Sequence, residues 1–118
     1  MMRIIVKRVY DSIDKTKGTR VLVDRIWPRG ITKQELQADL WLRDAAPTDG
    51  LRKWFGHDPA RWEEFKIRYC AELDAKPEIT RQLLELAREK GLVLLFSARD
   101  TQCNQAVVLK EYLLSLVY

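Results

Sequence analysis

The sequence is poor in the residues that build disulfide-stapled or metal-centred proteins. Its 118 residues include two cysteines and one histidine. Cys70 and Cys103 fall in different predicted helices without a pairing pattern, which excludes a disulfide framework and favours a reducing compartment. Metal-ligand spacing is absent, so we expect neither a metal nor another cofactor. The single histidine, His57, lies at a helix junction, where a structural role is more common than general-base catalysis.

Long apolar runs are absent as well. The apolar segment near the N-terminus is soon interrupted by charge, and it is too short for a signal peptide or a membrane span. We therefore expect a cytoplasmic protein with no membrane partner. With 47% hydrophobic residues, the chain can bury a core without staples, and we expect one domain over residues 1–118.

Positive charge is concentrated in the N-terminal third of the chain. The formal net charge is +4, and residues 1–33 hold nine Lys and Arg against three Asp. A basic region favours an anionic partner, and the sequence pI of about 9.2 brings nucleic acid into consideration.

Two apolar runs predict the centre of a parallel sheet. Residues 92–96 and residues 21–23 lack the polar alternation of a half-exposed strand, so each is expected to be buried on both faces. We expect them to be parallel neighbours, with further strands over residues 3–9 and 40–42. The predicted fold class is α/β: a single Rossmann-like domain with a mostly parallel central sheet and helices on both faces.

Helix starts are indicated by local capping signals. Thr32 and Glu35 form a capping box, Thr48 precedes an apolar stripe that ends at Gly56, and Asp58 stands before a proline. Further helices are predicted to begin at Pro77 and, after the 92–96 strand, at Asp100 or Thr101.

The first candidate binding loop is Asp24–Gly30, which follows a central strand. Binding loops of parallel sheets lie at the carboxyl ends of the strands. Arg25 and Arg29 are expected to face one pocket and to hold an anion, since a guanidinium binds phosphate or carboxylate through two parallel hydrogen bonds. Trp27, between them, could stack on a base or another ring. The alternative is that each arginine pairs with an acid such as Asp24 or Asp44.

The second candidate loop leads into the last helix. If that helix begins at Asp100 or Thr101, Cys103 lies in its first turn, where amides and the helix dipole favour an anion or a thiolate. Arg99 adds positive charge, so the pKa of Cys103 is expected to fall and the thiol becomes a candidate nucleophile. The alternative is a small packing residue. Asn104 is a further candidate ligand-binding residue, and Asp100 is a candidate catalytic residue.

Four ordered motifs resemble those of the YeaO-like branch of the bacterial domain-of-unknown-function family 488. They are Val23–Gly30, Leu40–Pro47, Leu51–Pro59 and Asn104–Leu109, which together span nearly the whole chain. The resemblance implies an α/β, Rossmann-like single domain and no established activity. The branch usually has histidine immediately before Asn104, where this chain has Cys103. The resemblance therefore implies no histidine base at that position and leaves a thiol role open.

Together these patterns predict a strand-end pocket for an anionic ligand. Arg25, Arg29, Arg99 and the helix amides would hold the anion, with Asp44 and Asp100 orienting the arginines. The first hypothesis is binding of a phosphorylated or nucleotide-like small molecule, with or without enzymatic turnover. The second is a nucleic-acid-binding module that uses the basic N-terminal third without catalysis. A partner-binding adaptor is the third.

Overall fold

The computed structural model describes residues 2–11 and 17–118. The strands are β1 (Ile4–Arg8), β2 (Thr19–Leu22), β3 (Leu40–Trp41) and β4 (Leu92–Phe96). The α-helices are α1 (Lys33–Leu36), α2 (Asp49–Phe55), α3 (Trp62–Asp74), α4 (Pro77–Glu89) and α5 (Gln105–Ser115). Two short 3-10 helices, η1 (Arg43–Ala45) and η2 (Pro59–Arg61), precede α2 and α3.

The four strands form one parallel sheet in the order β1-β4-β2-β3. All five residues of β4 are buried, as their continuous apolar run predicts. Val21 pairs with Leu94, which confirms that the two apolar runs are parallel neighbours. Val23 lies just beyond β2, and its amide donates to the Leu95 carbonyl (3.0 Å). The sheet therefore brings the chain segments after β2 and β4 to the same edge.

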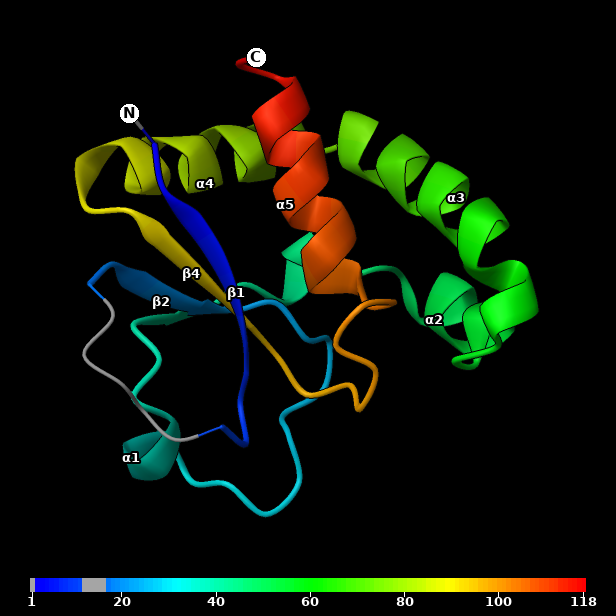
Figure 1. The fold of residues 1–118 in the computed structure, drawn as a ribbon, viewed down its shortest axis with the longest axis horizontal. Helices are drawn as coiled ribbons and strands as arrows, with labels where there is room; N and C mark the ends of the chain where they lie inside the picture. The colour runs from blue at the N-terminus through cyan, green and yellow to red at the C-terminus, as the bar shows by residue number, and fades with distance from the viewer. Residues whose placement is uncertain (1, 12–16) are drawn as a thin grey trace.

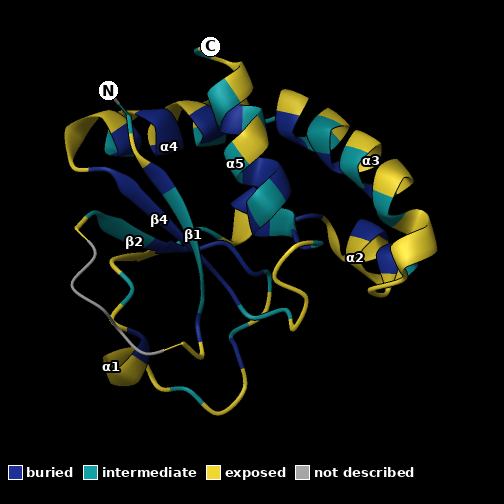
Figure 2. Cartoon of the chain, in the orientation of Figure 1, coloured by how far each residue is buried: buried dark blue, intermediate teal, exposed yellow. Residues whose placement is uncertain are grey.

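The sheet is covered unequally on its two faces. Helices α4 and α5 lie on one face, and α3 packs against these two helices; together they share a core with Leu92, Leu94 and Phe96 (Figure 1). The other face is covered by the single-turn helix α1 and its neighbouring loops, which pack on Val93 and Leu95. Buried residues concentrate at the sheet and on the inward sides of the helices (Figure 2). The predicted α/β fold class is confirmed, with a much thinner cover on the second face.

Most helix starts agree with the local signals. Thr32 and Glu35 form the reciprocal capping box of α1, and the Thr48 hydroxyl accepts the Leu51 amide at the start of α2. The Asp58 side chain accepts the Ala60 amide at η2, which leads directly into α3. In the described part of the chain, no helix is long and apolar enough to cross a bilayer.

The start of α5 differs from the prediction. The helix is capped by Asn104, whose side-chain oxygen accepts the Val107 amide (3.1 Å), and its first residue is Gln105. Asp100 does form a cap-like turn, because its Oδ1 accepts the amides of Gln102 and Cys103 (both 2.9 Å). That turn ends without becoming a helix, so Cys103 precedes α5 and does not lie in its first turn.

Candidate functional site

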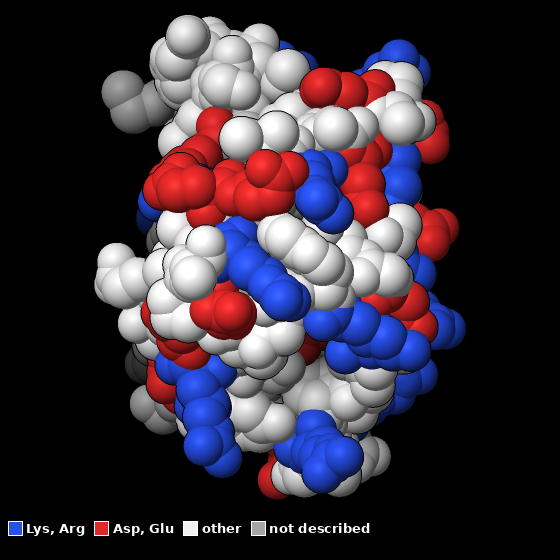
Figure 3. Space-filling model, turned by 90° about the vertical axis from the view of Figure 1, so that its right-hand side faces the viewer, with Lys and Arg blue, Asp and Glu red and all other residues white. Residues whose placement is uncertain are grey.

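A cleft of about 280 Å³ opens at the carboxyl ends of β2 and β4. The loop after β2, the loop after β4, and helix α2 contribute most of its walls, and α3 closes one side. Figure 3 shows this face of the molecule, with Lys and Arg side chains around a hollow in its lower half. The lining residues include Asp24, Arg25, Ile26, Pro47, Arg52, Lys53, Phe55, His57, Ala98, Asn104 and Gln105.

Asp24 is the buried carboxyl group of the cleft, with 7% of its surface exposed. Its Oδ1 accepts a hydrogen bond from Gln105 Nε2 (2.6 Å), and its backbone carbonyl accepts one from Trp41 Nε1 (2.7 Å). Burial raises the pKa of Asp24, and hydrogen bonds from Ser97 and Gln105 partly oppose this rise. Asp24 thus joins the end of β2 to β3, to the end of β4 and to the start of α5.

Arg25 lies on the cleft wall but is partly committed to the backbone. Its Nε donates to the Pro47 carbonyl (2.8 Å) and one terminal nitrogen to the Ala46 carbonyl (3.4 Å). That segment is itself fixed, because the buried Tyr69 hydroxyl donates to the Ala45 carbonyl (2.5 Å). The guanidinium is therefore held in a defined position. Among the described residues it forms no ion pair with Asp24 or Asp44, which was the predicted alternative.

Helix α2 and the residues after it add further cationic and polar groups. Arg52 and Lys53 occupy its last turn, and His57 follows the Gly56 cap with a left-handed backbone (φ 58°). All three line the cleft. Arg52 pairs with Asp49 at 3.1 Å on the exposed side of the same helix. The hydrogen bond from Arg52 lowers the pKa of Asp49, and the charges of Lys53 and Arg25 add to this effect.

Of the predicted ligand-binding residues, Arg25 and Asn104 line the cleft and Arg29 does not. Arg29 is exposed, and its backbone carbonyl accepts a hydrogen bond from the Tyr10 hydroxyl (2.8 Å). The reason is Trp27, whose ring packs against Trp41 at 5.3 Å on the thinly covered face of the sheet. The chain is drawn across to that face after residue 26, so the two arginines diverge.

The Trp27 side chain packs inside the protein and does not face the cleft. Besides the Trp41 contact, its Nε1 donates to the Ile31 carbonyl (2.7 Å). Asp44 and Arg99 are exposed and do not line the cleft; Asp44 offers its backbone carbonyl to Lys76 Nζ (2.8 Å). The predicted cluster of Trp27, Asp44 and Arg99 around the anion is therefore not assembled.

The loop before α5 gives a different chemistry from the predicted one. Asp100 takes up the amides of Gln102 and Cys103, so those amides do not form an anion cradle, and these bonds lower the pKa of Asp100. The pKa of Cys103 is raised, first by loss of hydration and then by the negative charge of Asp100. The expected lowering of this pKa is wrong, since it required a helix beginning at residue 100 or 101.

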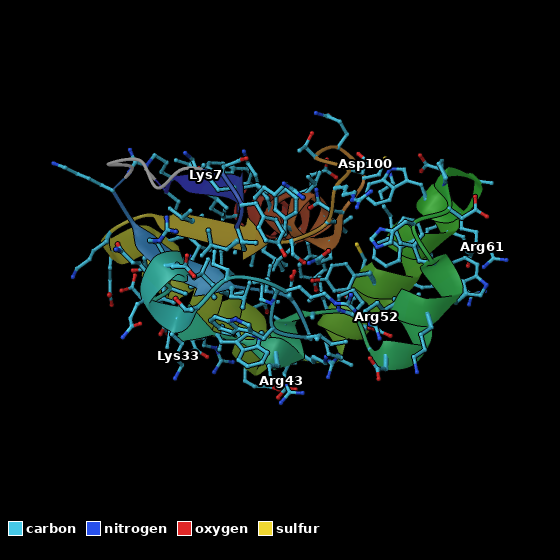
Figure 4. The ribbon with its side chains drawn as sticks, turned by 90° about the horizontal axis from the view of Figure 1, so that it is seen from below. Lys7, Lys33, Arg43, Arg52, Arg61 and Asp100 are labelled. Carbon is cyan, nitrogen blue, oxygen red and sulfur yellow. The ribbon has the colours of Figure 1, made fainter. Side chains whose placement is uncertain are left out.

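Arg52, Lys53 and His57 were missed by sequence reasoning. Basic residues in the last turn of a helix are explained by the helix dipole alone, so their presence in α2 carried no functional signal. A better signal was the glycine cap itself, which Arg52 and Lys53 precede and His57 follows, because a helix end can face a cleft. In Figure 4 Arg52 lies on α2 near the cleft, whereas Arg61 points outward and Lys33 and Arg43 lie elsewhere.

Metal coordination has no obvious place among the described residues. They contain no group of three or more His, Cys, Asp and Glu side chains arranged to hold a metal ion.

This arrangement is that of an α/β protein with a strand-end cleft, and the comparisons with known proteins identify the family. The chain belongs to the DUF488 family: residues 3–117 match the family model described as the inactive DUF488-N3 subclade. It is 41% identical to the uncharacterised protein YeaO of Escherichia coli, over 98% of this chain and 100% of the relative. It is 39% identical to the uncharacterised protein Rv3073c of Mycobacterium tuberculosis, over 94% of this chain and 93% of the relative. No solved structure matches the chain significantly.

Proposed function

We propose that the cleft binds a small organic anion of the phosphorylated or nucleotide-like class. The observation that carries this proposal is the convergence of Arg25, Arg52 and Lys53 on one cleft. The buried carboxyl group there, Asp24, is already bonded within the protein. Charge-assisted hydrogen bonds from guanidinium and ammonium groups are among the strongest that a binding site can offer to phosphate or carboxylate.

We propose binding without turnover. The matching family model carries the description "inactive". The candidate nucleophile Cys103 does not line the cleft, and its raised pKa disfavours the thiolate. The candidate acid Asp100 is engaged by backbone amides, which stabilise its ionised form. We place this binding protein in the cytoplasm, which fits its two free cysteines.

Nucleic-acid binding by the basic N-terminal third remains the competing proposal. A protein that neutralises several phosphates loses affinity steeply as salt rises, whereas a cleft that takes one anionic group does so only weakly. Lys7 and Lys33, two basic residues of that third, lie apart from the cleft side marked by Arg52 (Figure 4). The two functions can therefore be separated with matched variants.

The test is calorimetric titration with adenosine 5′-monophosphate and, separately, with a short single-stranded oligonucleotide. Lys53→Gln should weaken nucleotide binding by about fivefold to tenfold, the effect of losing one charged contact at a partly solvated site. Lys33→Gln removes the same charge from exposed helix α1 and should leave this affinity unchanged. Equal losses in both variants, or tighter oligonucleotide binding with steep salt dependence, would favour the nucleic-acid proposal.

A further inference from the structure

Resting on the proposed function, we infer that the ligand is an amphiphilic anion: one aromatic ring system joined to a single phosphate or carboxylate, with Ile26 contacting the ring. The cleft offers both kinds of contact. Its cations are Arg25, Arg52 and Lys53, and its lining also includes the apolar residues Ile26, Pro47, Phe55 and Ala98.

The size of the cleft limits the ligand to one aromatic ring system. The cleft volume is about 280 Å³, just below the range of roughly 300–1,000 Å³ that is typical of small-molecule sites. A dinucleotide is too large for such a volume, and so is a ligand with two aromatic ring systems beside its phosphate. An inorganic ion would leave most of the cleft empty.

Part of the cleft wall is apolar. Pro47 and Ala98 contribute aliphatic surface, and Phe55 stacks on Phe65 with ring centroids 4.3 Å apart. His57 lies beside Phe55, with ring centroids 6.0 Å apart. An aromatic or aliphatic ring gains free energy by covering such surface, in proportion to the apolar area removed from water.

Ile26 is the least protected part of this apolar wall. Its surface is 58% exposed although it lines the cleft. In the chain it lies between the buried Asp24 and the packed Trp27. A single exposed isoleucine needs no explanation on an open surface, and Ile67 on α3 is such a case at 66%. Ile26 differs because it lines the cleft and follows Arg25 in the chain, so a bound ring would bury it next to a charged contact.

The experiment compares phenyl phosphate with inorganic phosphate, each by calorimetric titration. Phenyl phosphate should bind about tenfold more tightly than inorganic phosphate, because its ring covers apolar surface in addition to the shared charge. Ile26→Ser should weaken phenyl phosphate binding about fivefold and leave inorganic phosphate binding unchanged. Ile67→Ser, the matched control on an open surface, should change neither.

The possible outcomes separate the inference from the proposed function. Equal affinities for the two probes in the natural protein would overturn the inference while leaving an anion site in place. Absence of binding by either probe would remove the proposed function and the inference together. NAD should bind at least tenfold more weakly than phenyl phosphate, and tighter NAD binding would contradict the size limit. These comparisons use the unaltered chain, so they hold even if an Ile26 variant folds poorly.

Discussion

Asp49 is the acid that pairs with Arg52, one of the cations that line the cleft. It lies within 3.1 Å of Arg52, and the charges of Lys53 and Arg25 also act on it. Both partners of the ion pair are substantially exposed, so the pair is easily exchanged for another anion. A ligand phosphate must compete with this carboxylate for the same cations.

Asp49→Asn should therefore tighten the binding of adenosine 5′-monophosphate by about threefold, because the competing charge is removed. Stability should change little, since the ion pair is exposed. The matched control is Glu64→Gln, which breaks an equally exposed ion pair with Arg68 on α3. Calorimetry on both variants gives the answer, and weaker binding in Asp49→Asn would mean that the carboxylate orients Arg52 and does not compete with the ligand.

The two cysteines should behave as unreactive thiols. Loss of hydration and a neighbouring carboxylate raise the pKa of each: Asp100 acts on Cys103, and Asp74 acts on Cys70. Since the thiolate is the reactive form, alkylation of both should require a higher pH than alkylation of a free cysteine. Mass spectrometry after treatment with a neutral reagent across pH, with glutathione as reference, measures this. Faster modification of Cys103 than of glutathione at neutral pH would refute it.

Asp24 should leave a signature in the pH dependence of stability. Its raised folded pKa means that the folded state binds its proton more tightly than the unfolded state does. The resulting stabilisation is present below the ordinary Asp pKa of about 3.9 and is lost as pH rises through the folded pKa. Relative to the natural protein, Asp24→Asn should thus gain stability over the interval that begins near pH 4 and ends at the raised folded pKa. Urea unfolding of both proteins across this interval tests the prediction. It would be contradicted if the free energy of unfolding of the variant fell further below that of the natural protein as pH rises.

At the scale of elements, the segment before α5 contains two successive caps. They explain why the start of α5 was predicted wrongly, and the second cap stabilises the helix. Asp100 accepts amides two and three residues ahead, and Asn104 then accepts an amide three residues ahead. Each pattern resembles a helix cap, and they follow one another within four residues. Sequence alone offers no means to decide which of them begins the helix, because the choice depends on where α5 packs.

Asn104→Ala should destabilise the protein by about 2 kcal/mol. The cap itself contributes about 1 kcal/mol, and the buried side chain also donates to the Asp100 carbonyl (2.9 Å). Thr32→Ala, which removes the exposed cap of the single-turn helix α1, should cost less. Denaturant unfolding of the two variants gives the comparison; an equal or smaller effect at Asn104 would mean that its cap does not anchor α5.

The sheet and most helix starts could be predicted from the sequence, because each of them is set by residues that are neighbours in the chain. The apolar run of β4, the Thr32 capping box and the Asp58-Pro59 start need no distant partner to be recognised. The site was only half predictable. Arg25 and Asn104 were correctly placed at the cleft, because strand-end loops converge in parallel sheets. Arg29 was not, because Trp27 packs on Trp41 and directs the chain away from the cleft. The sequence does not show that these two segments lie side by side.

For the whole molecule, one edge of the sheet organises the proposed function. Asp24, at the end of β2, is hydrogen-bonded to residues from β3 and α5, so the cleft floor is a rigid junction. The cations that surround it come from the loop after β2 and from α2. Basic residues of the N-terminal third are distributed more widely, with Lys7 and Lys33 on different parts of the surface (Figure 4). We therefore propose that the ligand is recognised in the cleft and not on a broad basic face.

The most direct test is a map of amide chemical-shift changes in the isotope-labelled protein during titration with phenyl phosphate. The account predicts saturable changes concentrated in three segments that line the cleft: residues 24–26, 46–57 and 97–105. Residues of α4 and of α1, which lie outside it, should be unaffected. Changes that are absent, or that centre on the basic residues of β1 and α1 and leave the cleft segments unmoved, would contradict the central claim.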